Sequence, residues 1–155
     1  MSLIYKKFIT DETDENGRLK SISFHPNDNF NFAFDVVDAL GEKIPDKKAM
    51  IWVSGKHEEK IFTFKDMKIY SSKAANYFKS LGIEKGDRVM LVLKRNYQFW
   101  FAINALHKIG AIVIPATHLL TKKDYVYRFN KAGVKAIVCT GDEEILQHVE
   151  NSVSE

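Results

Sequence analysis

The order of apolar and amphipathic segments between Phe62 and Cys139 is the strongest constraint on the fold. It predicts strand, helix, strand, helix, strand, helix and strand, with short connections. The later predicted strands, Arg88–Leu93, Ile112–Ile114 and Ala136–Cys139, are continuous apolar runs typical of sheets buried on both faces. Strands joined by single helices require right-handed parallel crossovers. We therefore predict an α/β fold with a doubly wound, mainly parallel sheet flanked by helices.

Two residue pairs with the same spacing mark predicted helix starts. Thr63 precedes Asp66 by three positions and Thr121 precedes Asp124 by three, a capping-box arrangement with aspartate in place of the usual glutamate. Helices are expected to start at about Phe64 and just after Thr121. The first of these places apolar residues on one face at helical spacing, namely Met67, Tyr70, Ala74, Phe78 and Leu81.

A third helix is predicted after Asn96, which can act as its N-cap, and is expected to continue to Gly110. Its first turns are rich in aromatic residues. Packing on the sheet and on neighbouring domains explains them better than a ligand slot. The aromatic residues are Tyr97, Phe99, Trp100 and Phe101.

The first part of the chain carries weaker signals. Residues 1–30 are polar and acidic, and we expect an N-terminal extension with little structure of its own. Residues 31–40 have the spacing of a short helix, which Gly41 should end. Two β-rich runs, Ala49–Val53 and Lys60–Phe64, flank a polar turn and predict a short hairpin.

Composition excludes several classes of function. The 23 basic and 20 acidic side chains leave a net charge of +3, and no basic stripe interleaved with aromatics indicates nucleic-acid binding. No apolar run approaches the ~18 residues that a membrane span needs. One cysteine, Cys139, excludes a disulfide framework and is interpreted as a core residue. Because the first ten residues lack a recognisable leader pattern, the predicted compartment is the cytoplasm.

Chemistry-bearing motifs are scarce in this chain. The pair Gly55-Lys56 lacks the several glycines of a phosphate-binding loop, so we interpret it as a turn. The histidines have no ligand spacing, and we predict neither catalytic nor metal-binding residues here. In doubly wound sheets ligands bind beyond the carboxyl ends of strands. Ligand contacts are therefore expected only in the loops after Leu93, Ile114 and Cys139.

Three motifs in order resemble adenylate-forming enzymes, the superfamily of acyl- and aryl-CoA synthetases. Phe62-Thr-Phe-Lys-Asp-Met67 looks like the L-T/S-Y/F-x-E-L opening of that family. Leu81-Gly-Ile-Glu-Lys-Gly-Asp-Arg-Val89 resembles its G-x-x-x-G-D-R-V turn. Leu106-His-Lys-Ile-Gly-Ala-Ile-Val-Ile-Pro-Ala-Thr117 resembles its K/R-x-G-A-x-x-x-P strand. The resemblance covers nearly all of residues 30–145.

A narrower resemblance is to the medium-chain acyl-CoA synthetase branch. Trp52-Val-Ser-Gly-Lys56, Phe99-Trp100 and Leu120-Thr-Lys-Lys-Asp-Tyr-Val-Tyr-Arg128 look like that branch's W-V-N-G-K, E-W-W and L-T-x-x-D-I-x-Y-R. Two departures stand out. Lys94-Arg95 replaces a frequent Pro-Arg, and Ala116 replaces a frequent glycine, so a methyl group stands where a substrate could otherwise approach the backbone.

The resemblance implies a two-step reaction. ATP, with Mg²⁺, activates a carboxylic acid to an acyl-adenylate, and CoA then displaces AMP to form the thioester. The residues that bind phosphate and Mg²⁺ in the family lie downstream of this region, so no catalytic role is transferred to this chain. The loop Pro115, Ala116, Thr117 and His118 is expected beside the CoA channel of the full-length enzyme. Residues 31–155 are then the first part of a truncated N-terminal domain.

Two alternatives remain open. The chain could be a free-standing binding or interaction module, or part of an adenylation domain that loads a carrier protein instead of CoA. On the leading hypothesis the isolated fragment is inactive and binds no ATP, AMP, metal or CoA. It is also expected to self-associate, because truncation should leave an unpaired strand edge and exposed apolar surface.

Overall fold

The largest sheet among the described residues is three-stranded and parallel, with the order β6-β5-β7. The structure is a computed structural model that describes residues 4–153. Strand β5 (Arg88–Val92) is followed by α3 (Gln98–Ile109), β6 (Ile112–Pro115), α4 (Lys122–Ala132), β7 (Val134–Cys139) and α5 (Glu143–Val153). The connection through α4 passes from β6 across β5 to β7, which reverses the winding. The predicted doubly wound α/β sheet is therefore confirmed.

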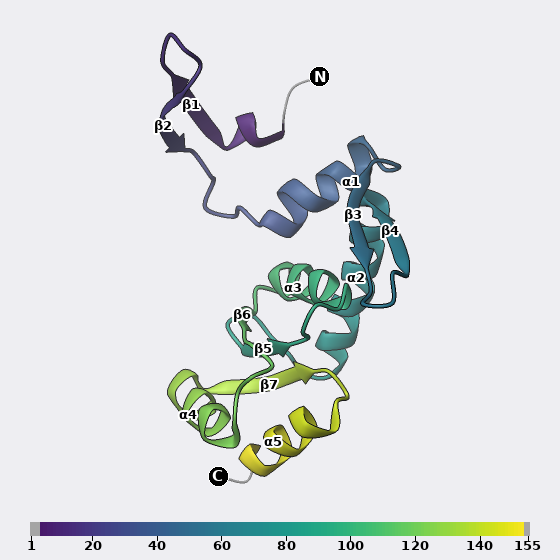
Figure 1. Ribbon diagram of the computed structural model, residues 1–155. Helices are drawn as coiled ribbons and strands as arrows, with labels where there is room; N and C mark the ends of the chain where they lie inside the picture. The colour runs from purple at the N-terminus through teal and green to yellow at the C-terminus, as the bar shows by residue number, and fades with distance from the viewer. Residues whose placement is uncertain (1–3, 154–155) are drawn as a thin grey trace.

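Helices cover both faces of this sheet, with α2 (Phe64–Ser80) and α3 above β7 in Figure 1 and α4 and α5 below it. Side chains of β5 alternate between the two cores. Val89 and Leu91 pack against α2 and α3, whereas Met90 and Val92 pack against α4 and α5. These four side chains have no exposed surface, as expected for a central strand buried on both faces.

Both predicted capping boxes are present. The hydroxyl of Thr63 accepts a hydrogen bond from Asp66 N at 3.2 Å, and Asp66 Oδ2 accepts one from Thr63 N at 2.9 Å. The same reciprocal arrangement joins Thr121 and Asp124 at the start of α4.

The predicted apolar face of α2 is only partly right. Its buried residues are Met67, Ser71, Ala75 and Phe78, while Tyr70 and Leu81 are exposed.

The predicted cap of α3 is wrong. Asn96 does not cap the helix, because its Nδ2 donates to the carbonyl of Leu93 at 3.1 Å and closes the turn after β5. The N-cap position is Tyr97, whose side chain makes no capping hydrogen bond. Gly110, with φ of 74°, ends the helix as predicted.

The prediction that residues 1–30 have little structure is wrong for residues 4–24, whereas residues 1–3 lie outside the described residues. A 3₁₀ turn, η1 (Ile4–Lys7), leads into an antiparallel hairpin of β1 (Ile9–Thr13) and β2 (Leu19–Phe24), which stands away from the sheet in Figure 1. Asp14 Oδ1 accepts hydrogen bonds from Asn16 N and Arg18 N and shapes the connecting turn. The hairpin was missed because its side chains are mostly exposed, so the sequence lacks the alternation of a half-buried strand.

The short helix predicted over residues 31–40 does not stop at Gly41. A π-helical segment, η2 (Ala33–Asp38), runs directly into α1 (Ala39–Lys43), which contains Gly41. A Cβ atom at Gly41 would lie 2.9 Å from the carbonyl oxygen of Phe64. The glycine is therefore explained by the close approach of two backbones, and the helix ends just before Pro45.

The predicted hairpin is confirmed as β3 (Lys48–Val53) and β4 (Glu59–Thr63), paired antiparallel. Gly55-Lys56 lies in its turn, where Ser54 Oγ accepts hydrogen bonds from Lys56 N and Glu58 N.

The helices described for residues 4–153 all fall short of the length and hydrophobicity that a membrane-spanning helix needs.

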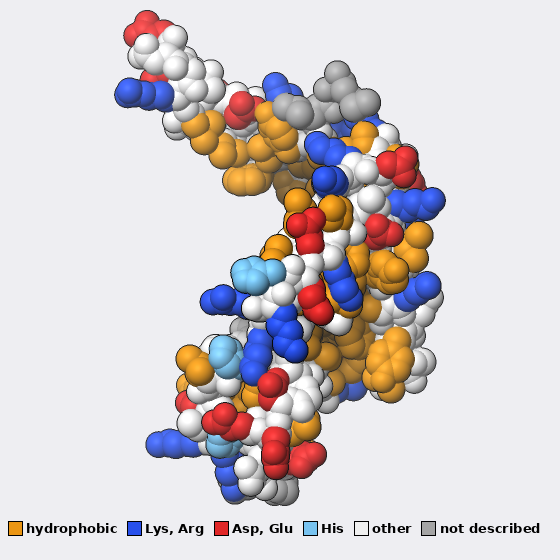
Figure 2. Space-filling view, turned by 45° about the vertical axis from the view of Figure 1, so that its right-hand side comes forward, with side chains coloured by type: hydrophobic (Ala, Val, Ile, Leu, Met, Phe, Trp, Pro, Cys, Tyr) orange, Lys and Arg blue, Asp and Glu red, His pale blue; other side chains and the backbone are white. Residues whose placement is uncertain are grey.

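The segment from η1 to η2 projects from the rest of the molecule and forms a bend with it (Figure 1). Figure 2 shows hydrophobic side chains along the inner side of this bend. The N-terminal part of the chain, up to η2, exposes several large apolar residues, namely Leu19, Ile22, Phe24, Phe32 and Phe34.

Candidate functional site

The loops that follow the three parallel strands meet at one edge of the sheet, which we call the carboxyl edge. The parallel register places Pro115 beside Leu91 and Cys139 beside Val92. Two backbone hydrogen bonds extend these ladders into the loops, from Ala116 N to Leu91 O and from Thr140 N to Val92 O. The loops singled out by the sequence therefore lie side by side.

Lys94 lies in the loop after β5, and its backbone is in the left-handed region with φ of 49°. Its Nζ lies 2.8 Å from Asp142 Oδ1, so it ties the loop after β5 to the start of α5. The hydrogen bond from Lys94 holds the pKa of Asp142 below its ordinary value. A left-handed non-glycine residue is strained, and such strain often occurs at functional sites. The sequence marked Lys94 only as a departure from the family pattern.

Two depressions flank this edge. One of about 540 Å³ lies on the side of α2 and α3, and its lining includes Tyr70, Leu93, Asn96, Phe101 and Thr140. The other, of about 400 Å³, lies on the side of α4 and α5 and is lined by Lys94, His118, Thr121, Asp142, Glu144 and His148, among others. The first is mainly apolar, whereas the second presents cationic, acidic and imidazole groups.

The four residues of the predicted CoA-channel loop have different surroundings. Pro115 is the last residue of β6, and Ala116 packs against the buried cluster around Met90. Thr117 is exposed, and its Oγ1 accepts a hydrogen bond from Leu119 N at 3.3 Å. Of the four, His118 reaches the second depression. The methyl group of Ala116 is thus partly buried against the core.

The residues present do not fit an ATP–Mg²⁺ site. Among residues 4–153, no three His, Cys, Asp or Glu side chains are placed to hold a metal ion. The only sequence segment reminiscent of a phosphate loop, Gly55-Lys56, is the β3–β4 turn. Burial raises the pKa of the Cys139 thiol, which does not favour a reactive thiolate.

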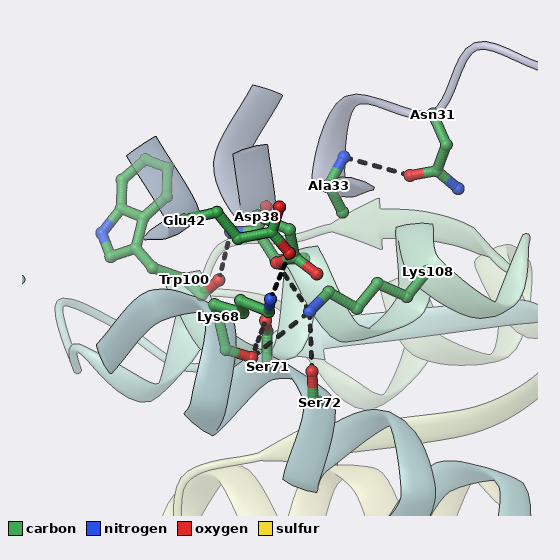
Figure 3. Close-up of polar contacts among 10 residues, drawn as sticks. Asn31, Ala33, Asp38, Glu42, Lys68, Ser71, Ser72, Trp100 and Lys108 are labelled. Carbon is green, nitrogen blue, oxygen red and sulfur yellow. Dashed lines mark hydrogen bonds and ion pairs between the residues drawn. The ribbon is translucent and has the colours of Figure 1, made fainter. Parts of the chain in front are cut away.

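A polar cluster lies where η2, α2 and α3 meet (Figure 3). The sequence did not predict it. Lys108 Nζ lies 2.8 Å from Asp38 Oδ1 and donates to Ser72 Oγ at 2.9 Å. Asn31 Nδ2 donates to the carbonyl of His107 at 2.7 Å. These contacts join η2 and the preceding Asn31 to α3, and α3 to α2. No short motif could indicate them, because the partners lie far apart in the sequence.

One protein family matches most of the chain. A family model described as "AMP-binding enzyme" matches residues 37–155, which is most of the chain. The chain belongs to the AMP-binding enzyme family. The resemblance noted in the sequence is thereby confirmed.

Curated relatives of this AMP-binding family member are acyl-coenzyme A synthetases. It is 39% identical over 133 residues to mitochondrial acyl-coenzyme A synthetase ACSM4 of Mus musculus, a match that covers 82% of this chain and 23% of the relative. It is 36% identical over 133 residues to mitochondrial ACSM2A of Homo sapiens, covering 81% and 22%. The chain thus spans less than a quarter of the length of these relatives.

Solved structures support the same fold. The Brucella canis acyl-CoA synthetase matches with a TM-score of 0.73 and 25% identity, covering 83% of this chain and 24% of that structure. A benzoate CoA ligase from Burkholderia xenovorans LB400 matches with a TM-score of 0.67 and 21% identity, covering 81% and 24%. The sheet and helices described above are therefore part of the adenylate-forming enzyme fold.

Proposed function

We propose that this chain is the first part of the N-terminal domain of an AMP-forming acyl-CoA synthetase. The full-length protein would activate a carboxylic acid with ATP to an acyl-adenylate and transfer the acyl group to CoA. The observation that carries the proposal is the match of residues 37–155 to the AMP-binding enzyme family, together with relatives named acyl-coenzyme A synthetases. Residues 31–155 would form this part, with residues 1–30 as an extension.

In the full-length enzyme this chain would supply part of the N-terminal domain's sheet and helices. Its carboxyl edge would contact a ligand. The carboxyl edge is where a doubly wound sheet binds ligands. Thr117 and His118 are exposed there, and His118 shares a depression with Lys94. We propose that Pro115, Ala116, Thr117 and His118 border the CoA channel of the full-length enzyme. ATP and Mg²⁺ would be held by residues outside this chain.

An assay of the full-length protein tests this function. With ATP, Mg²⁺ and a fatty acid, we expect acid-dependent release of pyrophosphate, and addition of CoA should give the acyl thioester. Absence of pyrophosphate release across short, medium and long acids and benzoate would overturn the proposal. Acid-dependent pyrophosphate release with transfer to a carrier protein, and none to CoA, would instead identify a carrier-loading adenylation domain.

The interaction-module alternative has a genetic test. A stop codon directly after Glu155 would favour a free-standing module, whereas a Ser/Thr/Gly-rich loop ending in Pro-Lys downstream would favour the enzyme.

The cellular compartment of the full-length protein is a separate question. The relatives reported above are named as mitochondrial, which does not support the cytoplasmic prediction made from the sequence. Fractionation of cells that express the full-length protein decides between the two compartments.

A further inference from the structure

Lys94 is the one lysine or arginine that lines either depression at the carboxyl edge. The depression that it lines, of about 400 Å³, also holds the imidazoles of His118 and His148. An ammonium group donates three hydrogen bonds, and a neutral imidazole can donate one. This depression therefore offers hydrogen-bond donors and one fixed positive charge to a ligand that carries anionic oxygens.

The backbone on both sides of Lys94 is fixed by hydrogen bonds. The carbonyl of Leu93 accepts one from Asn96 N at 3.0 Å and one from Asn96 Nδ2 at 3.1 Å. The carbonyl of Arg95 accepts one from Trp52 Nε1 at 2.7 Å, which ties this loop to β3. These contacts hold the left-handed backbone of Lys94, whose φ is 49°. The point from which the lysine side chain starts is therefore set by the protein itself.

Asp142 is the partner of this cation in the structure. Its Oδ1 lies 2.8 Å from Lys94 Nζ, and 35% of the lysine side chain and 44% of the aspartate side chain are exposed. An ion pair that is this exposed contributes little to stability. A phosphate oxygen carries negative charge and accepts the same hydrogen bonds as a carboxylate oxygen, so it can replace Asp142 at small cost.

Two further carboxylates border the same depression. Glu143 and Glu144 lie in the first turn of α5. Both are exposed, so water and salt screen their repulsion of an anion. Their charge still favours a ligand that places one anionic group beside Lys94 over a ligand that fills the whole depression with negative charge.

We propose that Lys94 binds a phosphate group of CoA, and that Asp142 pairs with the lysine until CoA displaces it. This inference rests on the proposed acyl-CoA synthetase function and extends it to a residue outside the loop 115–118. CoA joins phosphate groups to a neutral pantetheine arm, which matches a depression with a single fixed cation. Lys94 stands where the medium-chain branch often has proline, so this contact would be a property of this chain.

Steady-state assays of the full-length protein test both halves of the proposal. Lys94→Met removes the cation and should raise the apparent KM for CoA about tenfold, the effect of one hydrogen bond to a charged group. Asp142→Asn frees the cation and should lower that KM. The apparent KM for ATP should stay unchanged in both variants. A higher KM for CoA in both variants would mean that the pair only positions the two loops, and this result would overturn the proposal.

Two matched variants separate a specific contact from a general effect of charge. Lys94→Arg keeps a cation at the same position and should keep the KM for CoA close to the wild-type value. Lys123→Met removes an exposed cation of α4 that lines neither depression at the carboxyl edge, and it should also have no effect. If Lys123→Met raises the KM for CoA as much as Lys94→Met does, the effect is one of net charge and the proposal is wrong.

Shortened forms of CoA identify the phosphate group. Dephospho-CoA lacks the phosphate on the ribose, and pantetheine lacks every phosphate. If Lys94 binds the ribose phosphate, Lys94→Met should not change the KM for dephospho-CoA. If it binds the diphosphate, the effect should persist with dephospho-CoA and vanish with pantetheine. An effect that persists with pantetheine cannot come from a phosphate contact and would refute the proposal.

Failure of this inference and failure of the proposed function give different results. If the full-length protein forms acyl-CoA and Lys94→Met has the wild-type KM for CoA, only the role of Lys94 is wrong. If the wild-type protein forms no thioester with CoA, and calorimetric titration shows no binding of CoA, the CoA function itself is wrong and the role of Lys94 falls with it.

Discussion

Lys108 Nζ lies 2.8 Å from Asp38 Oδ1, and only 3% of the lysine side chain is exposed. This ion pair joins η2, at the start of the family-matched region, to the last turn of α3 (Figure 3). The lysine makes further contacts with Ser72 Oγ and with the carbonyl of Lys68, and its Nζ lies 5.6 Å from the centre of the Phe34 ring. The N-terminal helical segment is therefore held to the sheet domain by a buried, well-partnered cation.

Removal of one partner of this pair should be strongly destabilising. Lys108→Met leaves the Asp38 carboxylate buried without its cation, and we expect the free energy of unfolding to fall by about 3–5 kcal/mol. Urea denaturation followed by circular dichroism measures this change. The matched control is Glu42→Gln, which breaks the exposed ion pair between Glu42 and Lys68 and should have a much smaller effect. Equal losses in the two variants would contradict a special role for the buried pair.

A side chain at Gly41 should loosen the contact between α1 and the start of α2. A Cβ at this position would lie 2.9 Å from Phe64 O and 3.2 Å from Lys68 Cβ, so Gly41→Ala must shift a backbone. Overpacking outweighs the gain in helix propensity, and we expect a net loss of about 1–2 kcal/mol in thermal or urea unfolding. Gly55→Ala meets no atom within 4 Å and serves as the control. Destabilisation by both substitutions alike would point to a general glycine effect.

His107 should make stability depend on pH just below neutrality. Burial lowers the pKa of His107 from its ordinary value of 6.5. As pH falls through that value the unfolded chain binds the proton first, so the free energy of unfolding decreases until the folded-state pKa is reached and then levels off. His107→Gln should remove this slope, which urea titrations at a series of pH values would measure. His57→Asn, in the exposed hairpin turn, should leave the slope in place.

The loop after β6 should affect CoA more than ATP. In the full-length protein, Thr117→Ala combined with His118→Ala removes two exposed side chains at the carboxyl edge. If this loop borders the CoA channel, the apparent KM for CoA should rise several-fold more than that for ATP in steady-state assays. An equal or reversed effect on the two substrates would argue against that placement. Leu119→Ala, at the next exposed position, tests whether the loop responds to any truncation.

The 155-residue chain alone should not bind nucleotide. It contains no multi-glycine phosphate loop, and its one Gly-Lys pair forms a hairpin turn. Calorimetric titration with ATP and with AMP should show no micromolar binding. One-site micromolar binding of either nucleotide would mean that the depressions at the carboxyl edge form a nucleotide site of their own.

The local signals in the sequence determined the central architecture. Capping pairs such as Thr63 with Asp66, apolar runs such as Arg88–Val92 and the terminal Gly110 act over a few neighbouring residues, so they can be recognised without knowledge of the rest of the chain. The same holds for the placement of the loop at Pro115, because carboxyl ends of parallel strands must share an edge. The family resemblance, carried by contiguous motifs, belongs to this class.

Tertiary structure decided the features that depend on distant partners. The sequence predicted Gly41 as a helix stop, but the glycine is required by the close approach of the Phe64 backbone. The sequence predicted Asn96 as a helix cap, but its side-chain amide donates a hydrogen bond to the carbonyl of Leu93 instead. The pairing of Lys108 with Asp38 and of Lys94 with Asp142 brings together residues that the sequence separates widely. Only folding sets such distances, since the free energy of a buried or closely paired charge depends on the groups packed around it in space and not on its neighbours along the chain.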